Sequence, residues 1–410
     1  MSDPLAGKPR VVLGVGGGIA AYKACEVLRG LTESGHEVRV VPTEAALKFV
    51  GAATFEALSG NPVRTGVFSN VPDVEHVRIG QEANLVVVAP ATADLLAKAA
   101  HGLADDLLTN TLLTARCPVV FFPAMHTEMW EHPATRANVE LLRSRGLIVT
   151  DPDVGRLTGK DTGKGRFADP VDIIDLARLL IAEPDALPRD LAGVQVVVSA
   201  GGTREPLDPV RYLGNRSSGK QGYALARVAA ARGATVTLVA AHTVSLPTPA
   251  GVDLVSVSTA AQLREAVLNA AKSAQVVVMA AAVADFRPSR LAEHKIKKTA
   301  GEPEPVALER NADVLAELVG NRRPEQIIVG FAAETGDRQG DVLHHGRAKL
   351  RRKGSDLLVV NAVGEGRAFE VEDNAGWLLA ANGTETPIPF GSKSQLAAAV
   401  WDAVAGLHNR

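Results

Sequence analysis

The chain has 410 residues, of which 46% are hydrophobic, and its net charge is -2. This length favours two or more domains, each with its own core. The near-neutral charge gives no support to binding of nucleic acid over a broad surface. The first apolar stretch, Val11–Val15, is too short for a signal peptide or a membrane span. Only two cysteines occur, Cys25 and Cys117, so we expect no disulfide scaffold and a reducing, cytoplasmic setting.

Short apolar strands alternate with helical segments throughout the first half. Strands are expected at Val11–Val15, Glu37–Val41, Leu85–Ala89, Val119–Phe122 and Leu147–Thr150. Helices are expected at Ile19–Leu31, Thr43–Phe49, Leu95–Ala100, Asp105–Ala115, Ala134–Arg145 and Val171–Ile181. This alternation predicts a parallel sheet covered by helices on both faces. Such a sheet binds ligands beyond the carboxyl ends of its strands.

A polar segment, Arg156–Arg166, interrupts the alternation. Four glycines punctuate this region: Gly155, Gly159, Gly163 and Gly165. This pattern is typical either of a flap over a binding site or of an ordinary surface loop.

Residues 183–190 have the composition of a linker, which divides the chain into a domain at 1–182 and a second domain at 191–410. The second half alternates again. Strands are expected at Val194–Ser199, Thr235–Ala240, Val252–Ser256, Val276–Ala281, Ile327–Phe331, Leu357–Asn361, Gly376–Ala380 and Pro387–Pro389. Helices are expected at Gly222–Arg232, Ala260–Ser273, Ala312–Leu318, Gly340–Arg352 and Lys393–Leu407. A second α/β domain follows from this pattern.

A glycine-rich turn follows the first expected strand. Gly16, Gly18 and Ala21 match G-x-G-x-x-A, a tight turn that brings backbone N–H groups and a helix N-terminus to a phosphate. A dinucleotide usually requires an acidic side chain after the second strand, for the ribose diol. Thr43 stands there instead, and Glu44 can simply charge the next helix. The turn therefore favours a mononucleotide such as FMN, and a NAD-dependent dehydrogenase or a turn packed without ligand are the alternatives.

Two further loops follow strands at the same edge of the expected sheet. Ala89–Asp94 follows the third strand and Pro123–Trp130 follows the fourth, so both should converge with the glycine turn on one cleft. His76 precedes the third strand. A lone histidine of this kind is either a structural or exposed residue or a catalytic one.

Gly17–Lys23, Ala89–Asp94 and Pro123–Trp130 together resemble the flavin-dependent cysteine decarboxylase family. The last segment is similar to that family's P-x-M-N-x-x-M-W signature. The resemblance implies a flavodoxin-like (Rossmann-like) fold, bound FMN and a trimeric core with the flavin near a subunit boundary. FMN oxidises the thiol side of a cysteine amide in this family, CO₂ leaves, and the decarboxylases of coenzyme A biosynthesis then reduce the enethiol.

The resemblance also implies roles for single residues. His76, in the setting V-E-H-V-R-I, matches the family's catalytic histidine, and His126 lies where the substrate carboxylate binds. The residues that it implies for FMN are Gly17, Gly18, Ile19, Thr43, Ala91 and Thr92.

Two residues depart from the family pattern. His126 replaces the usual asparagine, so the charge of this carboxylate contact would depend on pH. Many relatives carry a proton-donating cysteine in the flap, whereas Gly159 stands at that place. Thr158, Lys160 and Asp161 are the neighbouring candidates for a proton donor.

The loop Gly201–Lys220 opens the second half between a strand and a helix. Glycines, hydroxyls, an amide, three arginines and a lysine suit it to an anionic ligand. It is not a P-loop, because Gln221 follows Lys220 where a Ser or Thr would hold Mg²⁺. More lysines follow later strands: Lys295, Lys297, Lys298, Lys349 and Lys353. Each alone is typical of a solvated surface, but together they suit a triphosphate.

The second half resembles phosphopantothenate–cysteine ligase over most of residues 191–365. The similar segments are Asp208–Tyr212, Asn215, Ser217–Lys220, Ala281–Phe286, Lys295–Lys298 and Phe331–Thr335. With the first half, the chain resembles the bifunctional bacterial enzyme of coenzyme A biosynthesis. The resemblance implies a second Rossmann-like domain that uses CTP and Mg²⁺ to activate 4′-phosphopantothenate as an acyl-cytidylate, which cysteine then attacks.

This second resemblance implies Asn215 and Lys295 as catalytic residues. It implies substrate contacts by Arg211, Ser217, Ser218, Gly219 and Lys220. It implies a CTP site formed by Met279, Ala280, Ala281, Asp285, Lys295, Lys297, Lys298, Asn311, Ala312, Asp313, Val314, Phe331, Lys349 and Lys353. The ligase domain is expected to dimerise, and trimers joined through dimers would close into a dodecamer.

Three functions stay open at this point. The first is a bifunctional ligase and decarboxylase that makes 4′-phosphopantetheine. The second is an active ligase whose domain binds FMN but decarboxylates poorly, given Gly159 and His126. The third is a non-enzymatic flavoprotein that acts as a regulatory partner, for which the set of lysines would have no use.

Overall fold

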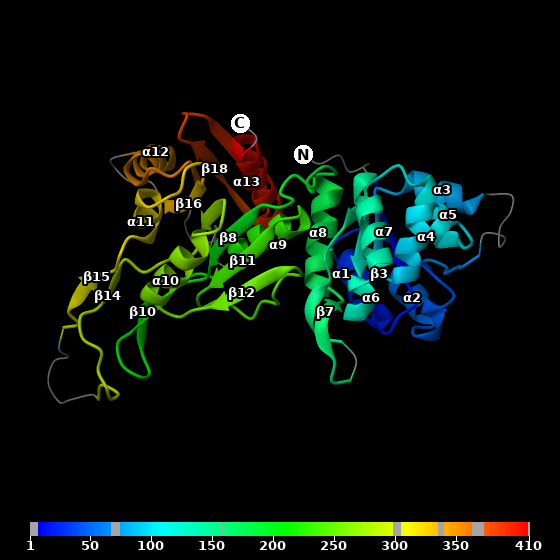
Figure 1. Ribbon diagram of the computed structural model, residues 1–410, viewed down its shortest axis with the longest axis horizontal. Helices are drawn as coiled ribbons and strands as arrows, with labels where there is room; N and C mark the ends of the chain where they lie inside the picture. The colour runs from blue at the N-terminus through cyan, green and yellow to red at the C-terminus, as the bar shows by residue number, and fades with distance from the viewer. Residues whose placement is uncertain are drawn as a thin grey trace. The chain divides into compact units, whose positions relative to one another are not determined.

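The computed structural model describes residues 7–66, 74–157, 159–297, 305–334, 340–362 and 373–408. The chain divides into two compact units (Figure 1), Met1–Pro188 with Pro249–Gly251, and Arg189–Thr248 with Val252–Arg410. Each unit is described by itself below. Among the described residues, no helix combines the length and the apolar character that a membrane crossing requires.

A five-stranded parallel sheet forms the centre of unit 1. Its order is β2-β1-β3-β4-β5, the order of flavodoxin-like folds. The strands are β1 (Arg10–Val15), β2 (Glu37–Pro42), β3 (Leu85–Ala91), β4 (Val119–Pro123) and β5 (Ile148–Val149). All five expected strands are confirmed. Their apolar runs are buried on both faces, which is why the runs are continuous rather than alternating.

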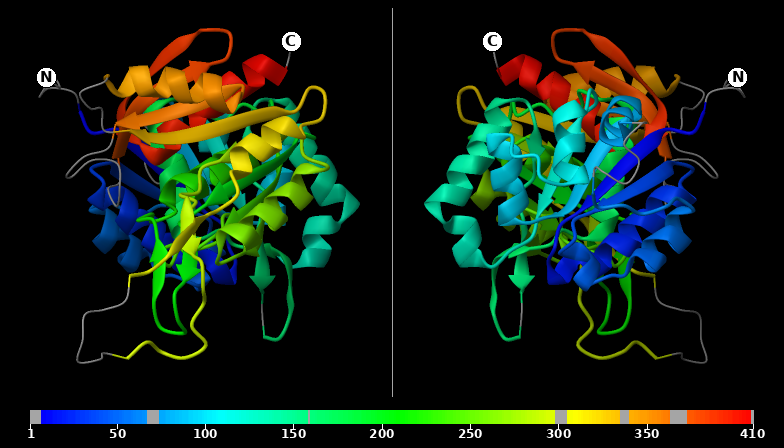
Figure 2. Two further views of the ribbon diagram at one scale, coloured as in Figure 1. Left: turned by 90° about the vertical axis from the view of Figure 1, so that its left-hand side faces the viewer. Right: turned by 90° about the vertical axis from the view of Figure 1, so that its right-hand side faces the viewer.

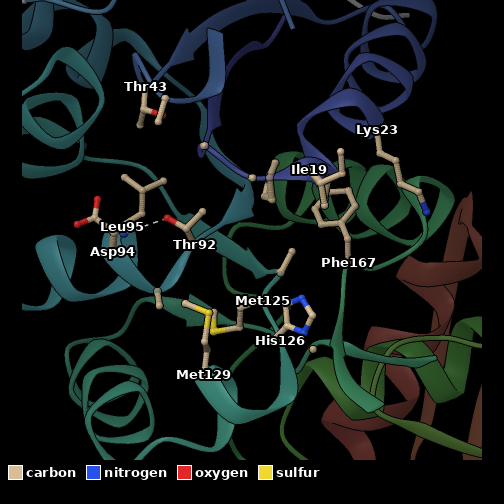
Figure 3. A pocket seen from close by; sticks show the side chains of 18 of the residues that line it. Ile19, Lys23, Thr43, Thr92, Asp94, Leu95, Met125, His126, Met129 and Phe167 are labelled. Carbon is tan, nitrogen blue, oxygen red and sulfur yellow. Dashed lines mark hydrogen bonds between the residues drawn. The ribbon is translucent and has the colours of Figure 1, made fainter. Parts of the chain in front are cut away.

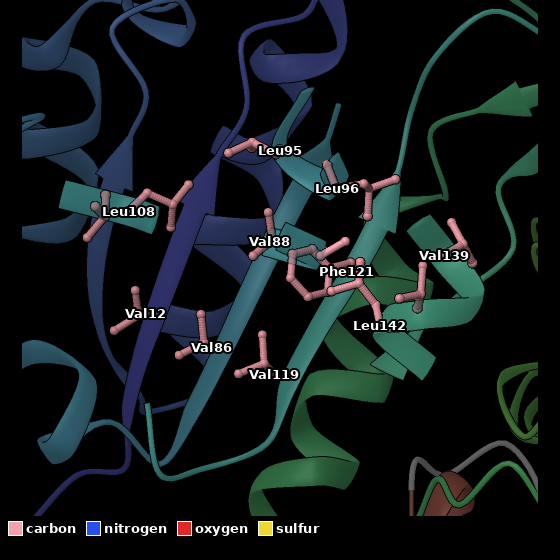
Figure 4. Packing of buried hydrophobic residues seen from close by; sticks show 14 of the residues in the cluster. Val12, Val86, Val88, Leu95, Leu96, Leu108, Val119, Phe121, Val139 and Leu142 are labelled. Atoms are coloured by element: carbon pink, nitrogen blue, oxygen red, sulfur yellow. The ribbon is translucent and has the colours of Figure 1, made fainter. Parts of the chain in front are cut away.

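Helices cover both faces of this sheet. They are η1 (Ile19–Lys23), α1 (Ala24–Glu33), η2 (Ala46–Lys48), α2 (Ala52–Ser59), α3 (Glu75–Glu82), α4 (Ala93–His101), α5 (Leu107–Thr114), α6 (Thr127–Glu131), α7 (Pro133–Ser144) and α8 (Pro170–Ala182). On one face α1 packs against α8. On the other, Figure 4 shows Leu95, Leu108 and Leu142 from three helices packed over Val88 and Phe121 of the sheet. Removing apolar surface from water stabilises the folded state by about 25 cal/mol per Å², so such a cluster is the main source of stability.

Two expected elements of unit 1 are wrong in detail. The helix expected at Thr43–Phe49 is a single 3₁₀ turn, η2, in which the Thr43 side chain accepts a hydrogen bond from the Ala46 N–H at 3.2 Å. The polar segment from Arg156 to Arg166 is not irregular, because it contributes to an antiparallel hairpin of β6 (Asp153–Arg156) and β7 (Thr162–Arg166). We call this hairpin the flap.

Unit 2 contains an eight-stranded sheet in the order β12-β11-β8-β13-β16-β17-β18-β19. Its first six strands are parallel and follow the Rossmann order, with the change of direction between β8 and β13. The last two strands are antiparallel. The strands are β8 (Gln195–Ala200), β11 (Thr235–Ala240), β12 (Val252–Ser256), β13 (Val276–Met279), β16 (Ile327–Glu334), β17 (Leu357–Ala362), β18 (Asp373–Ala380) and β19 (Glu385–Ser392). The expected Rossmann-like second domain is confirmed.

The helices of unit 2 lie on both faces of its sheet. They are α9 (Lys220–Ala231), α10 (Ala260–Ala271), α11 (Val314–Gly320), α12 (Val342–Lys353) and α13 (Lys393–His408). Helices α9 and α13 pack together, and the fully buried Trp401 donates its indole N–H to the Leu225 carbonyl at 2.9 Å. Helices α10 and α11 form a separate cluster with Val197, Val277 and Ile328 of the sheet.

Two short hairpins extend from this sheet and were not expected. One pairs β9 (Arg204–Pro206) with β10 (Tyr212–Gly214) inside the loop Gly201–Lys220, and the other pairs β14 (Phe286–Pro288) with β15 (Leu308–Arg310). Figure 2 shows the first hairpin running beside the segment that follows β14. The Ala292 N–H of that segment donates to the carbonyl of Leu207, which lies between β9 and β10, at 3.1 Å.

Candidate functional sites

A cavity of about 1030 Å³ opens at the carboxyl ends of β1, β3 and β4 (Figure 3). This is the edge at which parallel sheets bind ligands, and the volume is at the upper end of ordinary ligand pockets. The wall includes Gly17, Gly18, Ile19, Tyr22, Lys23, Thr43, Thr92, Asp94, Lys98, Met125, His126, Met129, Arg156, Arg166 and Phe167. Both expected loops, Ala89–Asp94 and Pro123–Trp130, therefore reach one site with the glycine turn.

Only glycine fits at the first two positions of the turn after β1. A Cβ at Gly16 would lie 2.5 Å from the Pro90 carbonyl oxygen, and a Cβ at Gly17 would lie 2.3 Å from the Ala45 Cβ. Gly18 begins η1 without a side-chain cap, so the first N–H groups of the helical run keep no intrahelical partner. A closely held turn with uncapped N–H groups at a cavity wall fits the phosphate of a mononucleotide.

Five of the six residues expected to contact FMN line this cavity, namely Gly17, Gly18, Ile19, Thr43 and Thr92. Ala91 is fully buried in β3 and does not line it. The Thr92 hydroxyl accepts a hydrogen bond from the Leu95 N–H at 3.3 Å and so caps α4 (Figure 3). The glycine turn with Thr43 and Thr92 supplies polar groups to the wall, and Met125, Met129 and Phe167 supply apolar surface on which a flavin ring can pack.

His126 lies on the wall beside Met125, and Figure 3 shows the side chains of Met125 and Met129 together on one side of its ring. Its carbonyl accepts the Met129 and Trp130 N–H groups, each at 3.0 Å, so the backbone at His126 is fixed where α6 begins. The flap packs against the same loop. The Met125 N–H donates to the Gly165 carbonyl at 2.9 Å, and a Cβ at Gly165 would lie 2.2 Å from the Met125 oxygen.

His76 is not brought to this cavity. It lies in α3, does not line the cavity, and its buried Nδ1 has no hydrogen-bond partner among the described residues. The Thr114 hydroxyl donates to its carbonyl at 2.9 Å. A buried imidazole nitrogen without a partner is costly, so packing within one chain does not account for the Nδ1 of His76.

None of the candidate proton donors in the described part of the flap lines the cavity. Lys160 and Asp161 are exposed and do not line the cavity, and Thr158 lies outside the described residues. Gly159 has φ +61°, a conformation that favours glycine over a cysteine. Arg156 does line the cavity and donates its Nε–H to the Gly159 carbonyl at 2.7 Å.

One end of the cavity is acidic. Lys98 lies 3.4 Å from Asp94 and 3.0 Å from Asp105, and the hydrogen bond that it donates to Asp105 raises the pKa of Lys98 above its ordinary value. The positive charge of Lys98 is therefore balanced by these two aspartates at the same end of the cavity.

The second candidate site lies where the sheet of unit 2 changes direction. Gly202 forms isolated bridges to Ala282 after β13 and to His242 after β11. Gly201 has φ +80°, and the Ala282 N–H donates to its carbonyl at 2.8 Å. These contacts hold the start of the loop Gly201–Lys220 across the carboxyl ends of three adjacent strands.

Several residues expected in the ligase site, the catalytic candidate Asn215 and members of the CTP set, meet at these strand ends. Asn215 donates its side-chain N–H to the Val283 carbonyl at 3.1 Å, and Asn311 donates to the Ala284 carbonyl at 2.8 Å. The Asn311 backbone N–H also donates to the Asp285 carbonyl at 2.9 Å. Met279 pairs with Gly330 across β13 and β16, which places Phe331 beside Ala280.

The other expected residues flank this group. Asp313 caps α11 by accepting the Ala316 N–H at 3.1 Å, and it is paired with Lys353. Burial alone would raise the pKa of Asp313, but Lys353 lowers it below the ordinary value. Gly219, with φ +80°, starts α9, and its N–H donates to the Ser217 hydroxyl at 3.3 Å. Ser218 and Lys220 adjoin it in the chain, and Lys349 lies one turn before Lys353 in α12.

Lys295 and Lys297 are exposed on the segment that follows β14, and Lys298 lies outside the described residues. Among the described residues, no hydrogen bond or ion pair joins Lys295 or Lys297 to Asn311. The lysine segment follows β14, and Asn311 follows β15, the strand that pairs with β14. Arg211 donates its Nη2–H to the Ile296 carbonyl at 2.9 Å and so connects this segment to the β9–β10 hairpin.

Sequence reasoning gave no role to Asp208, which organises this contact. Its fully buried carboxylate accepts the backbone N–H groups of Val210 and Arg211 at 2.8 and 2.7 Å, and that of Ile296 at 3.2 Å. Burial would raise the pKa of Asp208, but these bonds and Arg211 lower it. The sequence D-P-V-R indicates a turn, but its partner lies 88 residues away.

Comparison with known proteins matches both units. The family described as "Flavoprotein" matches residues 3–181, and the family described as "DNA/pantothenate metabolism flavoprotein C-terminal domain" matches residues 191–407. The fold and the sites thus define a flavoprotein domain followed by a pantothenate-metabolism domain.

Several relatives named coenzyme A biosynthesis bifunctional protein CoaBC match along nearly the whole chain, among them the following three. That of Mycolicibacterium smegmatis is 64% identical over 406 residues, 98% of each chain. That of Mycobacterium tuberculosis is 65% identical over 400 residues, 96% of each chain. That of Bacillus subtilis is 41% identical over 401 residues, 97% of each chain. The chain belongs to this family of bifunctional coenzyme A biosynthesis proteins.

Proposed function

We propose that the chain catalyses two successive steps of coenzyme A biosynthesis. Unit 2 joins cysteine to 4′-phosphopantothenate with CTP, and unit 1 decarboxylates 4′-phospho-N-pantothenoylcysteine to 4′-phosphopantetheine with FMN. The observation that carries this proposal is the presence, in one chain of this family, of two separate sites at the carboxyl ends of two Rossmann-type sheets. We assign decarboxylation to residues 1–182 and ligation to 191–410, with 183–190 as linker.

The cavity of unit 1 suits the first of these assignments. When bound, FMN supplies the oxidation of the cysteine thiol side that makes loss of CO₂ possible, and its reduced form returns the electrons to the enethiol. Gly17, Gly18 and Ile19 would hold its phosphate with backbone N–H groups, and Thr43 and Thr92 would adjoin it.

His126 would bind the substrate carboxylate by donating a hydrogen bond. The flanking Met125 and Met129 give that carboxylate an apolar surrounding, which favours its conversion to uncharged CO₂. We assign His76 the role of catalytic base. Because His76 lies outside the cavity of its own chain, the role requires the proposed trimer, in which a neighbouring copy would place its histidine at the flavin.

In unit 2 the substrate carboxylate would attack the α-phosphorus of CTP, forming the acyl-cytidylate and releasing pyrophosphate. The cysteine amine would then attack the acyl carbon, forming the amide and releasing CMP. Lys295 and Lys297 would stabilise the charge on the leaving pyrophosphate, with Mg²⁺ carried by the triphosphate. Asp285 and the backbone of Met279–Ala281 would read the cytidine, and Asn215 would hold the acyl-cytidylate.

We further propose a trimeric core of unit 1, a dimer of unit 2 and a closed dodecamer of the whole protein. The two cysteines are free thiols, as a protein of the reducing cytosol requires, and the cytosol is the setting we propose. The relatives are named as bifunctional proteins, so an active ligase with a weak decarboxylase is not favoured.

One pair of substitutions tests the division of labour. Lys295→Gln should abolish pyrophosphate release but leave decarboxylation of supplied 4′-phospho-N-pantothenoylcysteine unchanged, and His76→Asn should do the reverse. Lys272→Gln, at an exposed lysine at the end of α10, is the control and should change neither activity. Loss of both activities in both variants would show that the assignment of one activity to each unit is wrong.

A further inference from the structure

The cavity of unit 1 has an end that its flavin does not explain. Lys23 and Arg166 both line it, the first from η1 and the second from β7 of the flap. Figure 3 shows Lys23 and Thr43 on opposite sides of Ile19. We expect the flavin phosphate on the Thr43 side, where the glycine turn lies. The two cations therefore lie away from the Thr43 end of the turn.

One half-buried acid, Asp153, lies behind the cavity wall next to Arg166. Asp153 of β6 does not line the cavity, its side chain is 17% exposed, and its Oδ2 lies 3.8 Å from the Arg166 Nε. Burial raises the pKa of Asp153 above its ordinary value, and the hydrogen bond from the Val154 N–H and the charge of Arg166 oppose that rise, with Lys23 adding a weaker effect. Arg166 also packs along Gly155, where a Cβ would lie 2.9 Å from its Nη1.

Charge is distributed unevenly along the cavity. Asp94, Asp105 and Asp106 line the far end together with Lys98, which is paired with two of them. Figure 3 shows Asp94 and Lys23 on opposite sides of the cavity. At the flap end the wall carries Lys23, Arg156 and Arg166, while Asp153 and Asp169 stay off it. An anion that enters is therefore attracted to the flap end and repelled from the other.

We propose that Lys23 and Arg166 bind the phosphate monoester at the end of the substrate's pantothenoyl arm. This rests on the proposed function, in which the substrate carries one carboxylate and one phosphate. His126 serves the carboxylate, and a phosphate of nearly two negative charges needs more than one cation. A guanidinium offers a planar pair of donors and an ammonium a point charge, which together suit a phosphate. Because Arg166 belongs to the flap, phosphate binding would also fix the flap over the cavity.

The flavin is the other source of a phosphate monoester, and the experiment separates the two. The FMN-loaded full-length protein is assayed for decarboxylation of 4′-phospho-N-pantothenoylcysteine and of the same compound without its phosphate. The wild-type protein should prefer the phosphorylated substrate in kcat/KM by about 100-fold, since each charge-assisted contact contributes about 10- to 100-fold. Lys23→Met and Arg166→Met should each reduce this preference at least about tenfold, by slowing the phosphorylated substrate alone.

The control is Lys164→Met on the same strand of the flap. Lys164 pairs with Asp151 at 2.5 Å and does not line the cavity, so the preference should stay as in the wild type. Three results would overturn the proposal: a preference that survives both substitutions, an equal loss with both substrates, or loss of FMN from either variant, which would assign the cations to the flavin phosphate.

A binding measurement keeps this inference separate from the proposed function. FMN-loaded protein is titrated with 4′-phosphopantothenate and with pantothenate, and the change in flavin absorbance is followed. The phosphate site predicts that the wild-type protein binds the phosphorylated compound more tightly and that Lys23→Met abolishes this difference. That result would support the site even if neither cysteine substrate is decarboxylated. Equal affinity for the two compounds in the wild type overturns it.

Discussion

Gly17→Ala tests whether the turn after β1 holds the flavin. The new Cβ would lie 2.3 Å from the Ala45 Cβ and 2.9 Å from the Ala45 carbonyl carbon, where ordinary contacts begin at 3.4 Å. The turn must therefore open by about 1 Å, and overpacking of this kind costs about 1–3 kcal/mol. The free protein can relax by opening the turn, whereas FMN requires it closed, so the cost should appear as an affinity loss of about 5- to 150-fold.

The assay is a titration of flavin-free protein with FMN, followed by quenching of flavin fluorescence. Gly51→Ala is the matched control, because Gly51 has φ -65° and nothing lies within 4 Å of the added Cβ. It should bind FMN as the wild type does. If Gly17→Ala also binds FMN with wild-type affinity while remaining folded, the glycine turn does not hold the flavin phosphate and the assignment of Gly17–Ile19 is wrong.

Two further predictions concern unit 2. Arg232→Met should lower its free energy of unfolding by about 2 kcal/mol in urea titrations, because the 1%-exposed guanidinium loses its charge-assisted hydrogen bonds to Asp190 at 2.5 Å and to the largely exposed Asp402 at 2.6 Å; an unchanged unfolding midpoint would contradict this. Burial, and to a lesser extent the charge of Arg204, lower the pKa of His242 below its ordinary value of 6.5. The unfolded state therefore binds a proton more readily than the folded state, and stability is lost as the pH falls through 6.5 towards the folded pKa. His242→Gln should therefore flatten the stability profile below pH 6.5, and a profile parallel to that of the wild type would refute the reasoning.

The central strands could be predicted because parallel strands buried on both faces form uninterrupted apolar runs, as in Leu85–Ala89. The hairpins β9–β10 and β14–β15 could not. Tyr212–Gly214 and Leu308–Arg310 are three-residue strands exposed at every position, so they have no alternation to detect. The flap is similar, since glycines with positive φ at Gly155 and Gly165 indicate a turn more than a strand.

The candidate sites divide along the same line. The glycine turn could be predicted because its residues are adjacent in the sequence. Its position at a cavity follows from its place after a parallel strand. His76 is different, because whether a helix residue reaches a cavity depends on how separate elements pack. Asp208 accepts the N–H of Ile296, 88 residues away, and Asp153 pairs with Arg166 from the other strand of the flap, so neither role is visible in the local sequence.

One measurement tests the central claim most directly. The purified protein is incubated with 4′-phosphopantothenate, cysteine, CTP and Mg²⁺, and pyrophosphate, CO₂ and 4′-phosphopantetheine are quantified in the same reaction. Two active sites in one chain predict equal molar amounts of all three products. Pyrophosphate without CO₂ would contradict an active decarboxylase in unit 1, and the absence of both would contradict the proposed function as a whole.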